Sequence, residues 1–195
     1  MQLSKQKISR EPGYEEYNPL GKISVDGFLK QYWQKKPLLI RNAFPEIESP
    51  VSADELAGLA CEEQVNARLV LEKVKDKNWQ LEFGPFEESR FGELPESNWS
   101  LLVSDVEKHA PSARALLKAF RFIPDWRVDD LMISYAPAGG SVGAHTDAYD
   151  VFLIQLSGQR LWKISENYAP ETLADTDLCI LKDFVAEQEW LLNAG

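Results

Sequence analysis

The 195-residue chain has few cysteines, no long hydrophobic run and no export signal, and these shortages limit what kind of protein it is. Its two cysteines, Cys61 and Cys179, are far apart in the sequence and lack the Cys-x-x-Cys spacing, which favours two buried thiols. No stretch approaches the roughly 18–20 consecutive apolar residues of a membrane helix. The N-terminus has no apolar export signal. We therefore expect a cytoplasmic protein without membrane contact.

Positive charge is also scarce, since 21 Lys and Arg stand against 31 Asp and Glu, for a formal net charge of −10 at pH 7. Phosphate binding relies on clustered Lys and Arg, so this balance argues against nucleic acid as a direct partner. A cationic partner suits it better. With 44% hydrophobic and 11% aromatic residues the chain can form a core, which excludes wholesale disorder.

The chain is predicted to consist of a flexible polar tail, residues 1–18, and one domain over residues 19–195. The first part of this domain is predicted to be rich in helix. A capping box, with Ser52 as the N-cap and Glu55 three residues later, marks the start of one helix. Helices are expected at residues 25–33, 52–60 and 100–120, the last of them broken near Pro111.

Strands are predicted in the middle and in the second half of the chain. Period-2 alternation predicts a hairpin of residues 68–74 and 79–83, with its turn at residues 76–78. From residue 128 onward, short apolar runs separated by Gly, Pro and Ser are typical of a β-sandwich or barrel. Further strands are expected at residues 38–42, 131–135, 151–156, 160–164, 179–181 and 190–192.

The segment most informative about chemistry contains His145-Thr-Asp147 after a run of glycines. Side chains two residues apart on an extended segment project to the same side, so His145 and Asp147 can bind one metal ion. They would supply two ligands of a 2-His-1-carboxylate face, which leaves positions on Fe(II) open for oxygen and a cosubstrate. The structural alternative is a strand-end histidine hydrogen-bonded to Asp147. A phosphate-binding loop is excluded, because no Gly-Lys-Ser/Thr follows the glycines.

Arg160 lies at the start of a predicted strand, on one face with Trp162 and Ile164. Such an arginine either lies along the surface or forms a buried fork for a carboxylate, and its position alone favours the surface. The His145–Asp147 pair upstream favours the carboxylate.

Longer motifs resemble one known family from about residue 20 to residue 195. The most specific are Trp33-Gln-Lys-Lys-Pro37 and Asp125-Trp-Arg-Val-Asp-Asp-Leu-Met-Ile-Ser134, which accompany His145-Thr-Asp147, Gly158 and Arg160. In these motifs the chain resembles the Jumonji-C (JmjC) cupin domain of the bacterial ribosomal oxygenases, the ribosomal-protein arginine hydroxylases.

The resemblance implies a mainly β fold with N-terminal helices, a double-stranded β-helix of the cupin or jelly-roll type. It implies an Fe(II)- and 2-oxoglutarate-dependent dioxygenase that uses molecular oxygen to hydroxylate an arginine side chain of a large-subunit ribosomal protein. In this family His145 and Asp147 map onto two catalytic iron ligands. Arg160 maps onto the basic residue that binds the distal carboxylate of 2-oxoglutarate, and Ser134 onto a hydroxyl group on the preceding strand.

The implied substrate is a basic ribosomal protein, and opposite net charges favour its encounter with this acidic chain. Three acidic residues flank the proposed site and are candidates for holding the substrate guanidinium, although such residues are more often solvated strand ends. They are Asp129, Asp130 and Asp150.

The resemblance implies a second histidine ligand for the iron, and this sequence has no match for it. The other histidine, His109, lies at a predicted helix end and is better explained as a cation near a helix C-terminus than as a ligand. We therefore expect a C-terminally truncated chain that lacks the final barrel strands and is inactive as it stands, from a full-length protein that is a homodimer.

Two alternatives remain open. The first is a cupin-like binding or scaffold protein without oxygenase activity in the truncated form, which the missing histidine favours. The second is a small-molecule hydroxylase or cupin isomerase, which would have a narrow pocket without an acidic approach surface.

Overall fold

The computed structural model describes residues 17–74, 77–174 and 176–195, and the account below concerns this part of the chain. The helices are α1 (Val25–Gln31), α2 (Ala53–Leu59), α3 (Glu88–Gly92), α4 (Val106–His109) and α5 (Pro111–Leu117). The strands are β1 (Ala67–Val74), β2 (Lys77–Phe83), β3 (Trp99–Val103), β4 (Ile133–Tyr135), β5 (Gln159–Ile164) and β6 (Gln188–Asn193). Short 3-10 helices at Lys118–Phe120 and Asp125–Arg127 follow α5.

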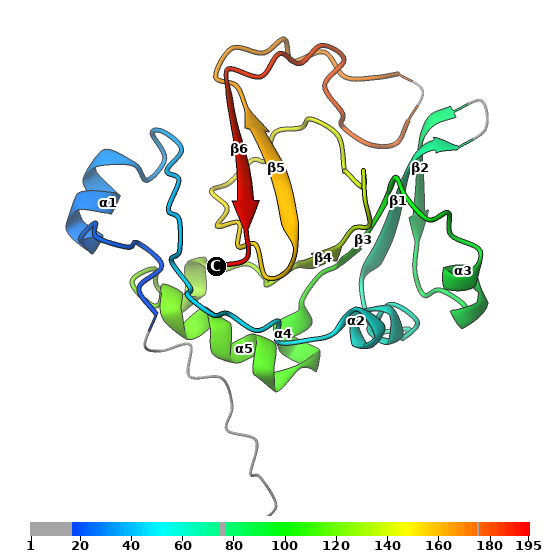
Figure 1. Cartoon of the computed structure of the whole chain (residues 1–195), viewed down its shortest axis with the longest axis horizontal. Coiled ribbons are helices and arrows are strands. Elements are labelled where there is room, and N and C mark those ends of the chain that lie inside the picture. The colour runs from blue at the N-terminus through cyan, green and yellow to red at the C-terminus, as the bar shows by residue number, and fades with distance from the viewer. Residues whose placement is uncertain (1–16, 75–76, 175) are drawn as a thin grey trace, which may run out of the picture.

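The strands form two antiparallel sheets, one of four strands in the order β2-β1-β3-β4 and one of the two strands β5 and β6. Helices α2, α4 and α5 lie together at the lower side of the molecule, and the β5–β6 pair stands across from the larger sheet (Figure 1). The prediction of a mainly β fold with N-terminal helices is therefore confirmed. None of the described helices has the length and apolar character needed to cross a membrane.

Local capping determines where the first helices begin. In α1 the Ser24 side chain accepts a hydrogen bond from the Gly27 amide. In α2 the predicted capping box is present, with reciprocal hydrogen bonds between Ser52 and Glu55. At α5 the first residue is Pro111, which needs no hydrogen-bond acceptor there because it has no amide hydrogen.

The predicted hairpin is present as β1 and β2, which pair from Arg68 with Phe83 up to Val74 with Lys77. Residue 76 of its predicted turn lies outside the described residues. The prediction of helix from residue 100 is wrong, because residues 99–103 form β3 between β1 and β4. Ser100, Leu101 and Val103 are all buried. A strand covered on both faces gives a continuous apolar run, which periodicity alone does not distinguish from helix.

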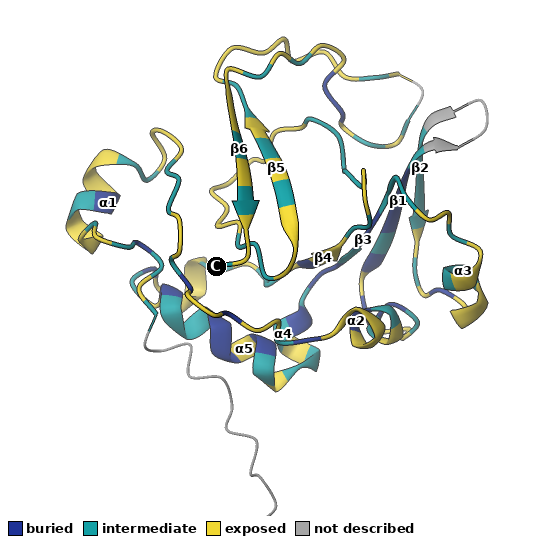
Figure 2. Ribbon diagram, viewed as in Figure 1, coloured by how far each residue is buried: buried dark blue, intermediate teal, exposed yellow. Residues whose placement is uncertain are grey.

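The largest core lies where the four-stranded sheet meets α2 and α4, and buried residues concentrate on β1, β3 and α5 (Figure 2). A second, aromatic cluster joins Phe44 and Phe120 to α5. Together the two cores fix the sheet from which the candidate site projects.

Three of the predicted C-terminal strands are present, as β4, β5 and β6. Residues 38–42 and 151–156 form no strand within the described part of the chain, and residues 179–181 contribute only an isolated bridge between Leu181 and Thr172. The prediction of two buried thiols is wrong for Cys179, which is exposed, while Cys61 is half-buried. The division at residue 18 stays a prediction, since residues 1–16 lie outside the described part.

Candidate metal site

The glycine-rich loop before His145 lies directly against the start of β3. A side chain at Gly140 would place its Cβ 2.1 Å from the Trp99 carbonyl oxygen, so only glycine fits this approach. The Asn98 amide donates to the Ala138 carbonyl over 3.0 Å. The Ser100 hydroxyl donates to the Ser141 carbonyl over 3.3 Å. These contacts fix one side of the loop to the central sheet.

The other side of the loop packs against a segment much later in the chain. Gly143 has a φ of +78°, and a Cβ there would lie 2.7–2.9 Å from three carbon atoms of Ile180. The Leu181 amide donates to the Ala144 carbonyl over 2.8 Å. Because Ile180 and Leu181 are themselves buried, the residues just before His145 are held from both sides.

The side chains of His145 and Asp147 lie close together at the end of this loop. His145 Nε2 is 3.8 Å from Asp147 Oδ2, and the two side chains are 41% and 40% exposed. A separation of 3.8 Å is too long for a hydrogen bond, which argues against the alternative of a histidine simply bonded to its neighbour. Two donors are thus presented side by side and within reach of solvent.

The orientation of the His145 ring suits a metal ligand. Its Nδ1 lies 2.9 Å from the Gly143 carbonyl oxygen. A carbonyl oxygen only accepts hydrogen bonds, so Nδ1 must carry the proton. In the neutral ring Nε2 then has a free lone pair, and it is the nitrogen that faces Asp147. Histidine ligands of metals are commonly oriented through the other ring nitrogen in this way.

These two donors can reach one ion. Bonds from nitrogen and carboxylate oxygen to a metal such as zinc are about 2.0–2.2 Å long, which places two ligands of one ion about 3.0–3.5 Å apart. The observed 3.8 Å is slightly longer, so a small rotation of either exposed side chain would bring both donors to one ion. Among the residues that the structure describes, no group of three or more His, Cys, Asp and Glu side chains could hold a metal ion. The described chain therefore presents two candidate ligands, His145 and Asp147.

Arg160 and Ser134 lie on different sheets. Arg160 is on β5 opposite Leu192, on the less exposed face that it shares with Trp162 as predicted. Its guanidinium lies 5.9 Å from the Trp162 ring, and burial lowers the pKa of this arginine, which nevertheless stays charged. Ser134 is exposed on β4 opposite Leu102. No hydrogen bond or ion pair between described residues joins either of them to His145 or Asp147.

In two of the three candidate acidic residues, one carboxylate oxygen already accepts a hydrogen bond from a backbone amide. Asp130 Oδ2 accepts from the Asp105 amide over 3.3 Å. Asp150 Oδ1 accepts from the Gln34 amide over 3.1 Å. Asp129 is exposed. Asp130 and Asp150 thus help to position backbone segments, and each retains a second oxygen for a ligand.

An aromatic cluster that the sequence did not reveal fastens the segment after Asp147 to the N-terminal region. The Phe152 ring stacks on Trp33, with centroids 5.9 Å apart and an interplanar angle of 22°, and contacts Phe28, Phe120 and Phe122. The apolar character of each aromatic residue was enough to predict that it packs in a core. Nothing in the sequence linked residues 28–33 with residue 152.

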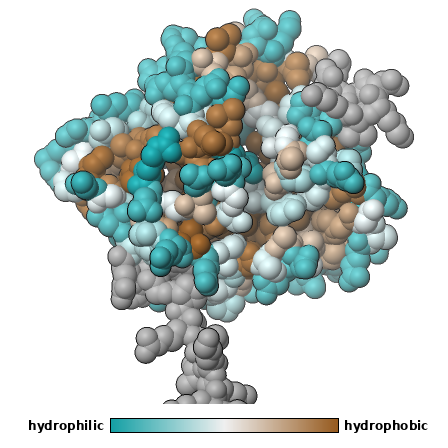
Figure 3. Space-filling model, in the orientation of Figure 1, coloured by the Kyte–Doolittle hydropathy of each residue, from teal (hydrophilic) through white to brown (hydrophobic). Residues whose placement is uncertain are grey.

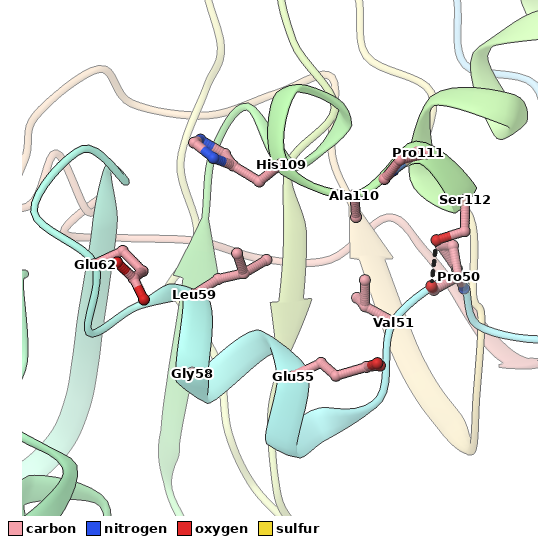
Figure 4. A pocket seen from close by; sticks show the side chains of 10 residues that line it. All are labelled: Pro50, Val51, Glu55, Gly58, Leu59, Glu62, His109, Ala110, Pro111 and Ser112. Atoms are coloured by element: carbon pink, nitrogen blue, oxygen red, sulfur yellow. Dashed lines mark hydrogen bonds between the residues drawn. The ribbon is translucent and has the colours of Figure 1, made fainter.

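His109 is the last residue of α4, as expected for a cation at a helix C-terminus. It lines a shallow cleft of about 380 Å³ together with Glu55, Glu62 and Ser112, between α2 and the start of α5 (Figure 4). Glu55 already accepts from the Ser52 amide in the capping box. The cleft is formed by a different part of the fold from the loop that carries His145.

Comparison with known proteins agrees with this architecture. The model of the JmjC domain family matches residues 115–195. The chain is 50% identical over 140 residues to ribosomal protein uL16 3-hydroxylase of Escherichia coli, a match that covers 71% of this chain and 36% of that protein. It is 47% identical over 144 residues to a probable ribosomal oxygenase of Haemophilus influenzae, covering 74% of this chain and 35% of the relative.

Solved structures give the same result. The X-ray structure of E. coli ycfD matches with a TM-score of 0.82 and 41% identity, over 89% of this chain and 46% of that one. A structure of YcfD with cobalt and 2-oxoglutarate matches with a TM-score of 0.77 and 42% identity, over 92% of this chain and 45% of that one. The chain spans only about a third of the length of the curated relatives. Over the part that it shares with them, the chain has the JmjC cupin fold and is similar in sequence and structure to the bacterial ribosomal oxygenases.

Proposed function

We propose that this chain carries the metal-binding and 2-oxoglutarate-binding part of an oxygenase that hydroxylates an arginine side chain of a ribosomal protein. The E. coli relative is named a ribosomal protein uL16 3-hydroxylase, and YcfD has been solved with cobalt and either 2-oxoglutarate or succinate. The observation in this chain that carries the proposal is the His145 ring, whose Nδ1 faces the Gly143 carbonyl and leaves Nε2 beside Asp147.

His145 Nε2 and Asp147 Oδ2 would hold Fe(II). Bound Fe(II) would supply the activation of dioxygen, in a reaction that converts 2-oxoglutarate to succinate and CO₂ and adds one oxygen atom to the substrate. The Gly143 carbonyl keeps the proton of His145 on Nδ1, so that Nε2 stays available to the metal. The packing of Gly143 on Ile180 holds this carbonyl in place.

Arg160 would bind the distal carboxylate of 2-oxoglutarate. A guanidinium presents two parallel N–H donors that match a carboxylate, and the half-buried position beside Trp162 excludes part of the competing water. Ser134 would add a hydroxyl donor from β4. Both assignments come from the family resemblance, and the chemistry of the two side chains supports them.

The substrate arginine would be held by acidic side chains near the site. Asp130 and Asp150 each retain one carboxylate oxygen after their hydrogen bonds to backbone amides, and Asp129 is exposed. A guanidinium can bridge such oxygens. Homodimerisation of the full-length protein remains a prediction from the family.

The proposal is tested by Co²⁺ binding, measured from the visible absorption that the ion gains on coordination. We expect the wild-type chain and the variant His109→Ala to bind alike, because His109 lines a separate cleft. His145→Ala should lose this absorption. Equal Co²⁺ binding by His145→Ala would contradict the assignment of the metal site.

A second candidate function is a cupin-like binding protein without oxygenase activity. It is favoured by the absence of a third protein ligand among the described residues. The two functions differ in turnover, which is measured as Fe(II)-dependent succinate formation together with a mass gain of one oxygen on ribosomal protein uL16. Turnover by this chain that is lost in His145→Ala would exclude the binding protein. Metal binding without turnover would support it.

A further inference from the structure

Positive charge is concentrated in one part of this acidic chain. Residues 20–42 contain five Lys and Arg against one Asp, and residues 118–127 contain three against one. These two segments hold 8 of the 21 basic residues but only 2 of the 31 acidic ones. Three further carboxylates adjoin them, Asp129 and Asp130 in the sequence and Asp150 through its hydrogen bond from the Gln34 amide, so the local balance is eight basic to five acidic residues. The exposed members are Lys22, Lys30, Lys35, Lys36, Arg41, Arg121 and Arg127.

The two segments lie side by side in the fold. The rings of Phe28 and Phe122 meet edge to face with centroids 5.9 Å apart. The Arg127 guanidinium lies 5.6 Å from the Trp33 ring. In Figure 3 hydrophilic atoms line the outer left edge of the molecule, where Figure 1 places α1, with hydrophobic atoms between them. The ring contacts place Arg127 beside the segment that contains Trp33, Lys35 and Lys36.

Much of this positive charge gathers where α1 ends. The Lys35 ammonium donates to the Lys30 carbonyl, and the Lys36 ammonium lies 4.8 Å from the Tyr32 ring. Lys30 is paired with Asp26 over 2.8 Å, but both side chains are more than 70% exposed, so this pair is strongly screened by water. Lys35 and Lys36 thus remain at the surface as cations.

An exposed tryptophan stands within this surface. Trp126 is 84% exposed, the most exposed of the large hydrophobic residues described. The Arg127 guanidinium lies 6.0 Å from the Trp126 ring and also contacts the Trp33 ring. This second contact positions residues 126 and 127 beside the segment that follows α1. An open indole beside a guanidinium is a platform on which an unpaired base can stack, while neighbouring cations bind the phosphates.

We propose that this basic aromatic surface, formed by Lys35, Lys36, Arg127 and Trp126 with the surrounding cations, binds single-stranded nucleic acid. The lysines contact phosphates, and Trp126 stacks on a base. The expectation of no nucleic-acid partner came from the charge of the whole chain, whereas phosphate binding depends on local clusters. An anionic membrane is less suitable, because α1 has only seven residues, its Phe28 is buried, and the partial exposure of Val25 (42%) and Leu29 (37%) falls short of the apolar face of a membrane-binding helix. The surface does not depend on the oxygenase function, and either proposal can fail alone.

The experiment measures fluorescence anisotropy of short labelled oligouridine, oligothymidine and duplex probes as this chain is added. The double variant Lys35→Gln/Lys36→Gln removes two cations from the surface. The control Lys163→Gln/Lys182→Gln removes the same charge from β5 and from the segment after Leu181, so both double variants have the same net charge. Trp126→Ala removes only the exposed ring. Circular dichroism confirms folding of each variant.

We expect either single strand to bind better than the duplex, with oligouridine against oligothymidine distinguishing RNA from DNA. Trp126→Ala should weaken single-strand binding about tenfold. The Lys35/Lys36 variant should lower the slope of log affinity against log salt by about 1.4, since each lost phosphate contact contributes about 0.7. The control should change neither value.

Three results would overturn the proposal. The first is no binding of any oligonucleotide at about 50 mM salt, where electrostatic contacts are strong. The second is an equal loss in the charge-matched control. The third is binding to phosphatidylserine vesicles that depends on Lys35 and Lys36 while the oligonucleotides do not bind, which would identify the surface as a membrane site.

Discussion

Replacing Gly143 by alanine tests whether the loop before the metal site is packed as described. The new Cβ would lie 2.7–2.9 Å from Cγ1, Cδ1 and Cγ2 of Ile180, which is too close for real carbon contacts. A left-handed φ of +78° costs a non-glycine residue about 1–2 kcal/mol. Overpacking against a buried side chain adds about 1–3 kcal/mol. We therefore expect a total loss of about 2–5 kcal/mol in the free energy of unfolding.

The assay is urea unfolding followed by tryptophan fluorescence, with two matched glycine variants. Gly158→Ala has a φ of +66° with nothing within 4 Å of the new Cβ, so it should show only the conformational cost of about 1–2 kcal/mol. Gly58→Ala, within α2 and in open space, should stabilise the chain by about 0.5–1 kcal/mol. If Gly143→Ala costs no more than Gly158→Ala, the loop does not pack on Ile180 and the reasoning is refuted.

Three further predictions concern other parts of the chain. Ser52→Ala removes the N-cap of α2 and should cost about 1 kcal/mol in urea unfolding, and an unchanged midpoint would exclude the capping box as a source of stability. Hydrogen bonds from the Glu166 amide and the Asn167 side chain lower the pKa of Glu187 below its usual value, so its contribution is present above pH 4.5 and lost as the pH falls through the lowered pKa. The stability of Glu187→Gln relative to wild type, measured against pH, should therefore converge in acid, and a constant difference would contradict this. Arg160→Gln should weaken 2-oxoglutarate binding to the metal-loaded chain by about 2–4 kcal/mol in calorimetry, whereas unchanged affinity would remove this residue from the cosubstrate site.

Elements determined by neighbouring residues were predictable from the sequence. The capping box of Ser52 and Glu55 depends on four consecutive residues, and the β1–β2 hairpin on strict alternation. For strand β3 the sequence predicts helix, because both faces of the strand are covered and its apolar run has no period of two. Residues 151–156 have the composition of a strand. A strand also needs a ladder of backbone hydrogen bonds with a partner. The Gly195 amide donates to the Gln155 carbonyl over 3.0 Å, but this segment forms no ladder with the described residues.

In the candidate site, too, the features set by neighbouring residues were predictable and the features set by the fold were not. The spacing of His145 and Asp147 was enough to expect both side chains on one side, and they lie 3.8 Å apart. The hydrogen bond from His145 Nδ1 to the Gly143 carbonyl was not predictable, because it depends on the left-handed conformation of Gly143 and on its packing against Ile180. The contact between Asp150 and Gln34 likewise joins segments that only the fold brings together.

The central claim is that His145 presents an unprotonated Nε2 to a metal beside Asp147. Nitrogen-15 NMR of the imidazole rings tests it directly, since the chain has only two histidines and His109→Ala assigns their signals. We expect neutral His145 to carry its proton on Nδ1, and added Mn²⁺ to broaden its Nε2 signal while leaving His109 sharp. A proton on Nε2 of His145, or equal broadening of both rings, would contradict the account.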